Sequence, residues 1–230
     1  MGQIQGNEQI VTNGLVLNLD AADRNSYPGT GTSWFDMSGN GNTGTLTNGP
    51  TYSTNNGGIF GFVSDDFVTI PENSALNTQT PSVEVWVKTN STNQSGFWFE
   101  KGQVNTQYSL FQEGTLIQWR QNFSSGQGLT NLSTTTATYM NTTNWYQVVG
   151  TFTSGTRRLY INGVQVNSDS QSGTIATNTN GMSIGVYGGF NGTRGYYYNG
   201  NIAIVKVYNR ELTAAEVLQN YNVERSRFGL

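Results

Sequence analysis

The chain has 230 residues, which is enough for one large β domain or two small ones, and only 11% of them are charged. Its formal net charge is −3 at pH 7, and a surface with so few cations is not built to neutralise phosphates, so we expect no nucleic-acid partner. Cysteine and histidine are absent, which excludes disulfides, Cys/His zinc sites and any mechanism that uses a thiolate or an imidazole base.

Residues 1–13 are polar and predict an N-terminal arm that a neighbouring subunit could order. The first residues lack the charged start and the apolar stretch of a signal peptide. No run of about 18 apolar residues occurs, so we expect no insertion into a membrane. No linker or shift in composition divides the chain from residue 14 onward, which predicts a single domain over residues 14–222.

Asn-Gly pairs occur at eight places, and both residues tolerate the positive φ angles of tight hairpin turns. Between the turns lie short segments whose apolar residues alternate, beginning with Leu15, Leu17 and Leu19. Residues 145–166 predict three strands joined by turns, and residues 200–209 predict the last strand of the series. About a dozen short strands at this spacing argue for an antiparallel sandwich or barrel.

Gly39, Gly41 and Gly44 have the G-x-G-x-x-G spacing of a dinucleotide-binding loop. That loop needs a helix at its third glycine, because the helix supplies the N–H groups that bind phosphate. Residues 43–50 instead contain alternating threonines and end in a Gly-Pro pair that stops a helix. The three glycines therefore predict a turn, and we expect no nucleotide.

One helix is predicted near the C-terminus. Thr213 is a good N-cap, and Glu216 three residues later completes a capping box. An apolar stripe follows and is expected against the edge of the sandwich. The stripe consists of Val217, Leu218 and Tyr221. Residues 223–230 predict a short C-terminal tail.

Taken in order, these segments resemble a known family over residues 14–222. The most specific piece is WYQVVGTFTSGTRRLYINGVQV at residues 145–166. WFDMSGNGNTGTLTNGPTY resembles the family's Asp-x-Ser-Gly-Asn-Gly loop, and GNIAIVKVYNRELTAAEVLQNYN resembles its last strand and helix. The chain is similar to laminin G-like members of the concanavalin A-like lectin/glucanase superfamily. The resemblance implies an all-β fold, a two-sheet antiparallel jelly-roll sandwich with one short C-terminal helix.

The resemblance also implies a calcium ion, because some relatives hold one near such loops. Calcium takes about six to eight oxygen ligands, often from loop carboxylates. The candidate ligands for a structural calcium ion are Asp20, Asp36, Asp65 and Asp66. The alternative is that these aspartates bond to nearby backbone N–H groups and stabilise turns.

Carbohydrate binding is a second hypothesis, because an aromatic face and polar hydrogen-bonding groups together hold a sugar. Residues 187–199 interleave aromatic residues with turn glycines, so we expect several of these rings at a rim. The candidates are Trp34, Trp98, Trp119, Tyr187, Phe190, Asn191, Arg194, Tyr196, Tyr197, Tyr198 and Asn199. The alternative is that such rings fill the core, which we favour for Trp86 and Trp145 in regular strands.

No catalytic residues are predicted. Glycosidases of this fold use paired carboxylates, and the glucan-hydrolysing relatives carry a Glu-x-Asp-x-x-Glu run that this sequence lacks. Glu84, Glu100 and Glu113 occur singly in different segments. The family often has an acidic residue where this chain has Ala203, which puts in doubt any site that relies on that carboxylate.

The ending LQNYNVERSRFG is similar to versions of this domain in tailed-phage and other virus structural proteins. We therefore predict a non-enzymatic protein of the virion surface: a capsid decoration, fibre or tail-associated protein that cements the particle and adheres to host glycans. Its partners would be other virion proteins and copies of itself, as a trimer by analogy. Two alternatives remain, a secreted or cell-surface carbohydrate-binding module and a glycoside hydrolase of the same fold.

Overall fold

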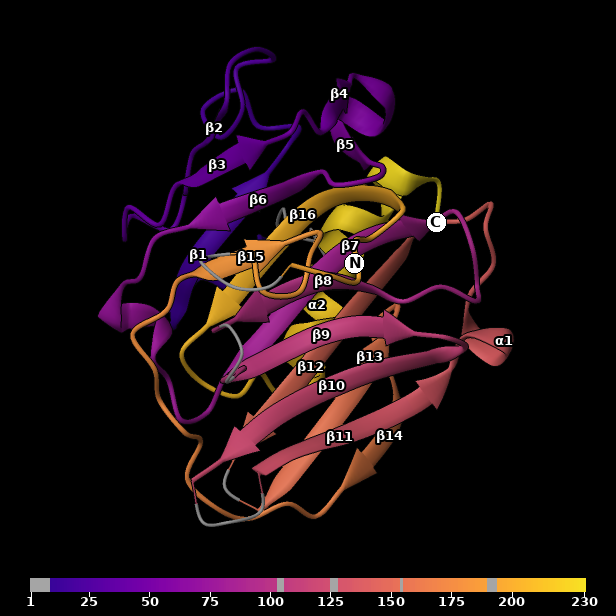
Figure 1. The fold of residues 1–230 in the computed structure, drawn as a ribbon. Coiled ribbons are helices and arrows are strands. Elements are labelled where there is room, and N and C mark those ends of the chain that lie inside the picture. The colour runs from indigo at the N-terminus through magenta and orange to yellow at the C-terminus, as the bar shows by residue number, and fades with distance from the viewer. Residues whose placement is uncertain (1–8, 103–105, 125–127, 154, 190–193) are drawn as a thin grey trace, which may run out of the picture.

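The computed structural model describes residues 9–102, 106–124, 128–153, 155–189 and 194–230. These residues form two antiparallel sheets that face each other, with the C-terminal helix behind one of them (Figure 1). The predicted two-sheet sandwich with one short C-terminal helix is therefore confirmed. Short strands joined by turns at Asn-Gly pairs build both layers, as the alternating pattern requires.

Sheet A contains eight strands of the described residues. Their order is β14-β13-β12-β7-β16-β5-β4, and β1 also pairs with β16. The bounds are β1 (Leu15–Asp20), β4 (Thr51–Ser53), β5 (Ile59–Phe62), β7 (Ser82–Thr89), β12 (Tyr146–Thr153), β13 (Thr156–Ile161), β14 (Val164–Asp169) and β16 (Gly200–Tyr208). The three strands predicted within residues 145–166 are β12, β13 and β14.

Sheet B also contains eight strands of the described residues. Their order is β11-β10-β9-β8-β15-β6-β3-β2. The bounds are β2 (Ser33–Trp34), β3 (Gly44–Thr47), β6 (Phe67–Ile70), β8 (Gly96–Lys101), β9 (Tyr108–Glu113), β10 (Leu116–Phe123), β11 (Gly128–Thr135) and β15 (Met182–Ile184). Neighbouring strands in both sheets run antiparallel, so each strand presents alternate side chains to the core and to the outside.

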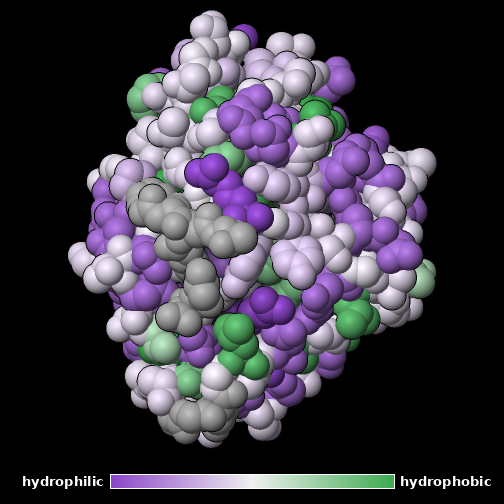
Figure 2. Space-filling model, viewed as in Figure 1, coloured by the Kyte–Doolittle hydropathy of each residue, from purple (hydrophilic) through white to green (hydrophobic). Residues whose placement is uncertain are grey.

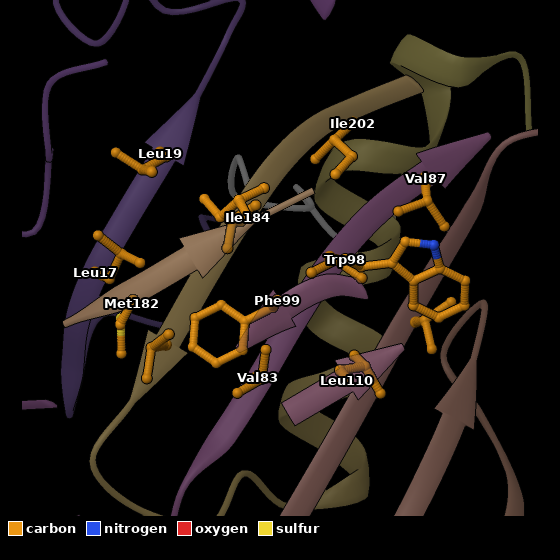
Figure 3. Close-up of a cluster of buried hydrophobic side chains, with 14 of the residues drawn as sticks. Leu17, Leu19, Val83, Val87, Trp98, Phe99, Leu110, Met182, Ile184 and Ile202 are labelled. Atoms are coloured by element: carbon orange, nitrogen blue, oxygen red, sulfur yellow. The ribbon is translucent and has the colours of Figure 1, made fainter. Parts of the chain in front are cut away.

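The core lies between the two sheets. Figure 3 shows Val83 of β7 beside Phe99 of β8, and Val87 of β7 beside Trp98 of β8. None of these side chains is exposed to solvent. The alternation predicted for β7 is confirmed, because Trp86 lies on the other face of the same strand, in a separate cluster.

A β-bulge in β8 changes which side chains face the core. The pairing with β9 shifts register between Phe97 and Phe99. Trp98 and Phe99 consequently both join the core, although they are consecutive, while Phe97 is outside that cluster. The bulge leaves Phe97 and Glu100 on the outer face of sheet B.

Helix α2 (Ala214–Glu224) begins at Thr213 with the predicted capping box. It covers the outer face of sheet A, where Val217 packs on Tyr208 and Tyr160, and not the edge of the sandwich as predicted. Leu218 of the predicted apolar stripe does not face the sheet, because it remains 43% exposed. Among the described residues, no helix has both the length and the hydropathy needed to span a bilayer.

The shorter helices are α1 (Thr136–Tyr139), η1 (Asn55–Gly57), η2 (Ser74–Leu76) and η3 (Arg225–Phe228). The predicted tail, residues 223–230, is part of the fold, because η3 brings the Phe228 ring to 4.3 Å from Trp86. Residues 1–8 of the predicted arm lie outside the described residues. Val11 of the same arm is buried, and its N–H donates to Asn220 Oδ1 at 2.8 Å.

Candidate ligand-binding pocket

The outer face of sheet B carries a pocket of about 330 Å³. Figure 2 shows this face, which is largely hydrophilic and has small, separate hydrophobic patches. Three adjacent strands supply the floor, with Phe97 from β8, Phe111 from β9 and Arg120 from β10. Tyr187 and Tyr196, from the segment between β15 and β16, supply the walls. The remaining lining residues are Ser95, Gln112 and Glu113.

Strand pairing determines the floor. Phe97 and Phe111 are cross-strand partners, and their rings stack with 4.2 Å between centroids and 3° between planes. The Arg120 guanidinium carbon lies 4.3 Å from the Phe111 centroid, within cation–π range. Arg120 Nε donates to Asn131 Oδ1 at 2.9 Å, which connects the side chain to β11. Burial is the main cause that lowers the pKa of Arg120.

The aromatic walls are held by the backbone. Tyr187 and Gly195 exchange two backbone hydrogen bonds of 3.0 and 3.2 Å, so the two arms of this segment are paired. The Phe97 N–H donates to Tyr196 O at 3.2 Å and joins the segment to β8. Tyr196 has φ of +52° and is 56% exposed. A bulky residue in this left-handed region is strained, and such strain concentrates at functional sites.

A buried carboxyl group anchors this segment from below. Glu100 is not exposed, and its Oε2 accepts the Gly188 N–H at 2.7 Å while its Oε1 accepts the Thr106 hydroxyl at 2.7 Å. Burial raises the pKa of Glu100 to about 7, although these bonds and Arg120 favour the ionised form. Glu100 thus connects β8 to the residue next to Tyr187.

Of the predicted glycan-binding residues, Tyr187 and Tyr196 lie together in the pocket. Arg194 is exposed, and its guanidinium carbon lies 4.6 Å from the Phe67 ring. Tyr197 is half-buried, and exposed Asn199 accepts a hydrogen bond from Asn90. The structure does not place these last three residues among the lining. The predictions for Phe190 and Asn191 lie outside the described residues.

The structure corrects the prediction that four other aromatic side chains lie at a sugar-binding rim. None of their side chains is exposed to solvent, so they do not form a rim. Trp34 packs edge-on against Phe60 at 4.8 Å, and Trp98 packs against Tyr198. Trp119 fills the core beside the backbone of Gly150. The alternative interpretation, that rings in this sequence fill the core, holds for these four. The four are Trp34, Trp98, Trp119 and Tyr198.

Phe97, Phe111 and Arg120 were not predicted from the sequence. Phe97 is followed by Trp98 and Phe99, and three consecutive aromatic residues do not reveal which one faces outward. The bulge decides this, and nothing in the local sequence predicts it. Alternation along β9 and β10 was a usable signal, because it places Phe111 and Arg120 on the face opposite Leu110.

The aspartates predicted as calcium ligands bond to protein donors. Asp36 accepts the N–H groups of Asn18, Ser38 and Asn42, all at 2.9 Å. The nearby Gly39 and Gly41 have φ of +85° and +73°, which confirms that these glycines serve a turn. The alternative interpretation, a turn-stabilising aspartate, therefore describes Asp36.

The other three aspartates have protein partners of their own. Asp20 accepts from Arg227 at 2.6 Å, Asp65 accepts from Asn48 at 2.8 Å, and Asp66 accepts the N–H of a neighbouring turn residue at 3.0 Å. Within the described ranges, no three His, Cys, Asp or Glu side chains are grouped so that they could hold a metal ion. Calcium binding by these residues stays a prediction.

Folding does bring two carboxyl groups together, but not at the surface. Glu84 and Glu224 both bond to Lys206 beneath helix α2. Glu84 and Lys206 are at most 1% exposed, and Glu224 is 10% exposed. A polysaccharide cannot reach this cluster, so it lacks the access that the two-carboxylate mechanism of glycosidases needs.

Comparison with known proteins gives the family. The family model described as "Concanavalin A-like lectin/glucanases superfamily", of laminin G type, matches residues 62–218. The chain belongs to this superfamily. The matched region runs from the end of β5 into helix α2 and contains every lining residue of the pocket. No curated protein sequence matches the chain.

Solved structures with a similar fold include binding domains of clostridial toxins. The botulinum neurotoxin serotype D binding domain has a TM-score of 0.70 at 17% identity, covering 92% of this chain and 52% of that one. The binding domain of Paraclostridial Mosquitocidal Protein 1 has a TM-score of 0.70 at 16% identity, covering 92% of this chain and 52% of that one. The binding domain of botulinum neurotoxin DC, in complex with rat synaptotagmin II, has a TM-score of 0.72 at 12% identity, with the same coverage of the two chains. This chain thus spans about half the length of those chains, and the likeness shows a shared fold.

Proposed function

We propose that the chain is a non-enzymatic carbohydrate-binding domain whose pocket over the Phe97–Phe111 pair holds a sugar residue. The single observation that supports this most is the convergence of aromatic rings with a few polar groups in one concave site. Ligand pockets combine these features: apolar surface gives contact area, and sparse polar groups set orientation. Arg120, Ser95 and Glu113 are the polar groups beside the rings.

The similar toxin domains support a binding role without naming a ligand. A further similar structure is the botulinum neurotoxin type G receptor binding domain, and the binding domain of botulinum neurotoxin DC was solved in complex with rat synaptotagmin II. These domains share the sandwich with this chain at 12–16% identity. Their binding role makes a similar role on this scaffold the natural first hypothesis.

The positions of the carboxyl groups near the pocket argue against hydrolysis. Glu100 and Glu113 are the carboxyl groups near Arg120, and Glu100 is bonded to the Thr106 hydroxyl and the Gly188 N–H. The two-carboxylate mechanism of glycosidases needs both groups at the substrate. Glu100 is also not exposed to solvent. We therefore expect no release of reducing sugar from a polysaccharide panel, and release that is lost in Glu113→Gln would overturn the non-enzymatic assignment.

A glycan array tests the binding role. The parent chain should bind a defined subset of glycans, and Tyr196→Ala should weaken that binding at least tenfold, because it removes the most exposed ring of the pocket. Phe35→Ala is the matched control, since Phe35 is 44% exposed but does not line the pocket. Absence of glycan binding by the parent chain would refute the proposal.

The virion surface is the location that we propose for this domain, on the basis of the sequence resemblance. Other virion proteins and copies of the chain would be its partners, and the polar surface suits side-by-side packing with wet interfaces. Mass spectrometry of purified particles tests the location, and light scattering tests the trimer.

Calcium binding is tested by thermal unfolding with EDTA and with excess calcium. An unchanged melting temperature would exclude a structural ion.

A further inference from the structure

Arg120 has unused hydrogen-bonding capacity in the pocket. Its Nε is occupied by Asn131, but among the described residues neither terminal nitrogen donates a hydrogen bond. The guanidinium plane lies over Phe111, so the side chain is already oriented before a ligand arrives. A planar pair of free donors matches a carboxylate, which can accept two parallel hydrogen bonds from it.

The groups around Arg120 include two carboxyl groups that compete with a bound anion. The groups that face it are Glu113, Tyr187, Glu100 and Tyr196. Glu113 is exposed, and its carboxylate is already engaged by the side-chain amide of Gln118 at 2.6 Å. Glu100 has a pKa of about 7, so near neutral pH it carries only part of a negative charge. Glu113 is therefore the main anion that competes for Arg120, and a ligand carboxylate must bind through the two terminal nitrogens that the described residues leave unused.

We infer, building on the proposed function, that the pocket selects acidic sugars and that Arg120 binds their carboxylate while Tyr196 covers the sugar ring. Sialic acids and uronic acids share this chemistry. A neutral sugar would leave the guanidinium fork with hydroxyl partners only, and hydrogen bonds between two charged groups are about twice as strong as neutral ones. The acidic group thus supplies specificity, and the rings of Tyr187 and Tyr196 supply contact area.

The inference predicts how binding depends on pH. As the pH falls from 8 to 6, Glu100 takes up a proton, and the negative charge near Arg120 decreases. Affinity for an acidic sugar should then rise several-fold, while affinity for a neutral sugar should stay constant. In Glu100→Gln the rise should disappear.

Isothermal titration of the full chain with three probes tests the inference. The probes are 3′-sialyllactose, trigalacturonic acid and lactose. The first two distinguish a sialic acid from a uronic acid as the carrier of the carboxylate, and lactose is neutral. The parent chain should bind at least one acidic probe tenfold or more tightly than lactose. Arg120→Gln should lower the affinity for that probe at least tenfold. Arg120→Lys should lower it less, because lysine keeps the positive charge but lacks the paired planar donors of the guanidinium group.

Two further variants sharpen the test. Glu113→Gln should tighten binding of the acidic probe two- to fivefold, because it removes a competing anion beside Arg120. Arg24→Gln is the control for net charge, since exposed Arg24 lies outside the pocket lining and should leave affinity unchanged. Circular dichroism confirms that each variant is folded.

The outcomes separate this inference from the proposed function. Binding of neutral glycans with no preference for acidic ones would overturn the role of Arg120 and leave the carbohydrate-binding proposal standing. Equal binding of the acidic probe by the parent chain and by folded Arg120→Gln would overturn it as well. If no glycan of any charge binds, both proposals fail.

Discussion

Lys206 Nζ lies 3.0 Å from Glu84 Oε1, and the two residues are directly opposed across β16 and β7. Helix α2 covers the pair and adds Glu224, which also bonds to Lys206, and Asn220, whose amide donates to Glu84 Oε2 at 2.7 Å. Trp86 Nε1 donates to Glu224 Oε2 at 2.7 Å. Helix α2 is thus attached to sheet A by a buried polar network as well as by apolar packing.

Lys206→Met should destabilise the fold by about 3–5 kcal/mol, because removal of one partner leaves two carboxyl groups buried without their cation. Burial works against the charge of Lys206, but Glu224 and Glu84 raise its pKa well above the usual range, so Lys206 is charged at neutral pH. Burial raises the pKa of Glu224 to about 8, whereas Lys206 outweighs burial at Glu84 and lowers its pKa, so Glu84 is the ionised partner. Urea denaturation measures the change. Lys88→Met is the control, because Lys88 lies on the same face of β7 as Glu84 but is partly exposed. This substitution should lower the free energy of unfolding by less than about 0.5 kcal/mol. Equal effects of the two variants would contradict the network.

Glu100 should make the fold less stable as the pH rises from about 4.5 to 7. Its pKa moves from 4.5 to about 7 on folding, chiefly because of burial. Between these values the folded state binds more protons than the unfolded state, so the free energy of unfolding falls with increasing pH. The loss from this group is on the order of 3 kcal/mol and is complete above pH 7.

Glu100→Gln tests this sign. The variant cannot ionise, so the decrease between pH 5 and pH 8 should shrink, and at pH 8 the variant should be at least as stable as the parent chain. Urea denaturation at both pH values is the measurement. A variant that keeps the full decrease would show that another group causes it.

Local pattern was sufficient to predict the fold, because turns and alternation act over a few residues. Asn-Gly pairs set the hairpins, and alternation on β7 assigned its valines to the core and Trp86 to the other face. The helix position needed tertiary information. Asn220 is a polar residue inside α2 that is fully buried because Glu84 and Val11, both distant in sequence, bond to it.

The sequence predicted only two residues of the pocket lining, because the other lining residues depend on contacts between strands. Tyr187 and Tyr196 lie in a glycine-rich segment whose composition marks a loop, so their candidacy was visible in the sequence. Phe97 and Arg120 come from regular strands. The bulge sets the outward direction of Phe97, whereas alternation along β10 was a usable signal for Arg120. Tyr198 is only two residues beyond Tyr196, yet it is fully buried, because its N–H bonds to Gly185 O and turns the ring inward.

Gly150→Ala should cost about 1–3 kcal/mol through overpacking. A Cβ at Gly150 would lie 2.4 Å from the Trp119 ring, and that ring is enclosed by the core. Gly61→Ala is the matched control in β5, since its Cβ would meet nothing closer than 3.5 Å. Thermal unfolding of both variants is the measurement. A neutral Gly150→Ala would mean that Trp119 has room to move.

Phe228→Ala tests whether the last residues belong to the domain. The Phe228 ring stacks on Trp86 at 4.3 Å and packs at a tilt against Trp145 at 4.9 Å, and only 7% of the residue is exposed. Removing it should cost about 3 kcal/mol and shift the tryptophan emission to the red, because the two indoles gain contact with water. Leu218→Ala is the control for an apolar truncation on the same side, and at 43% exposure it should cost less than about 1 kcal/mol. Unchanged emission and stability in Phe228→Ala would show that this ring does not hold the last residues against the domain.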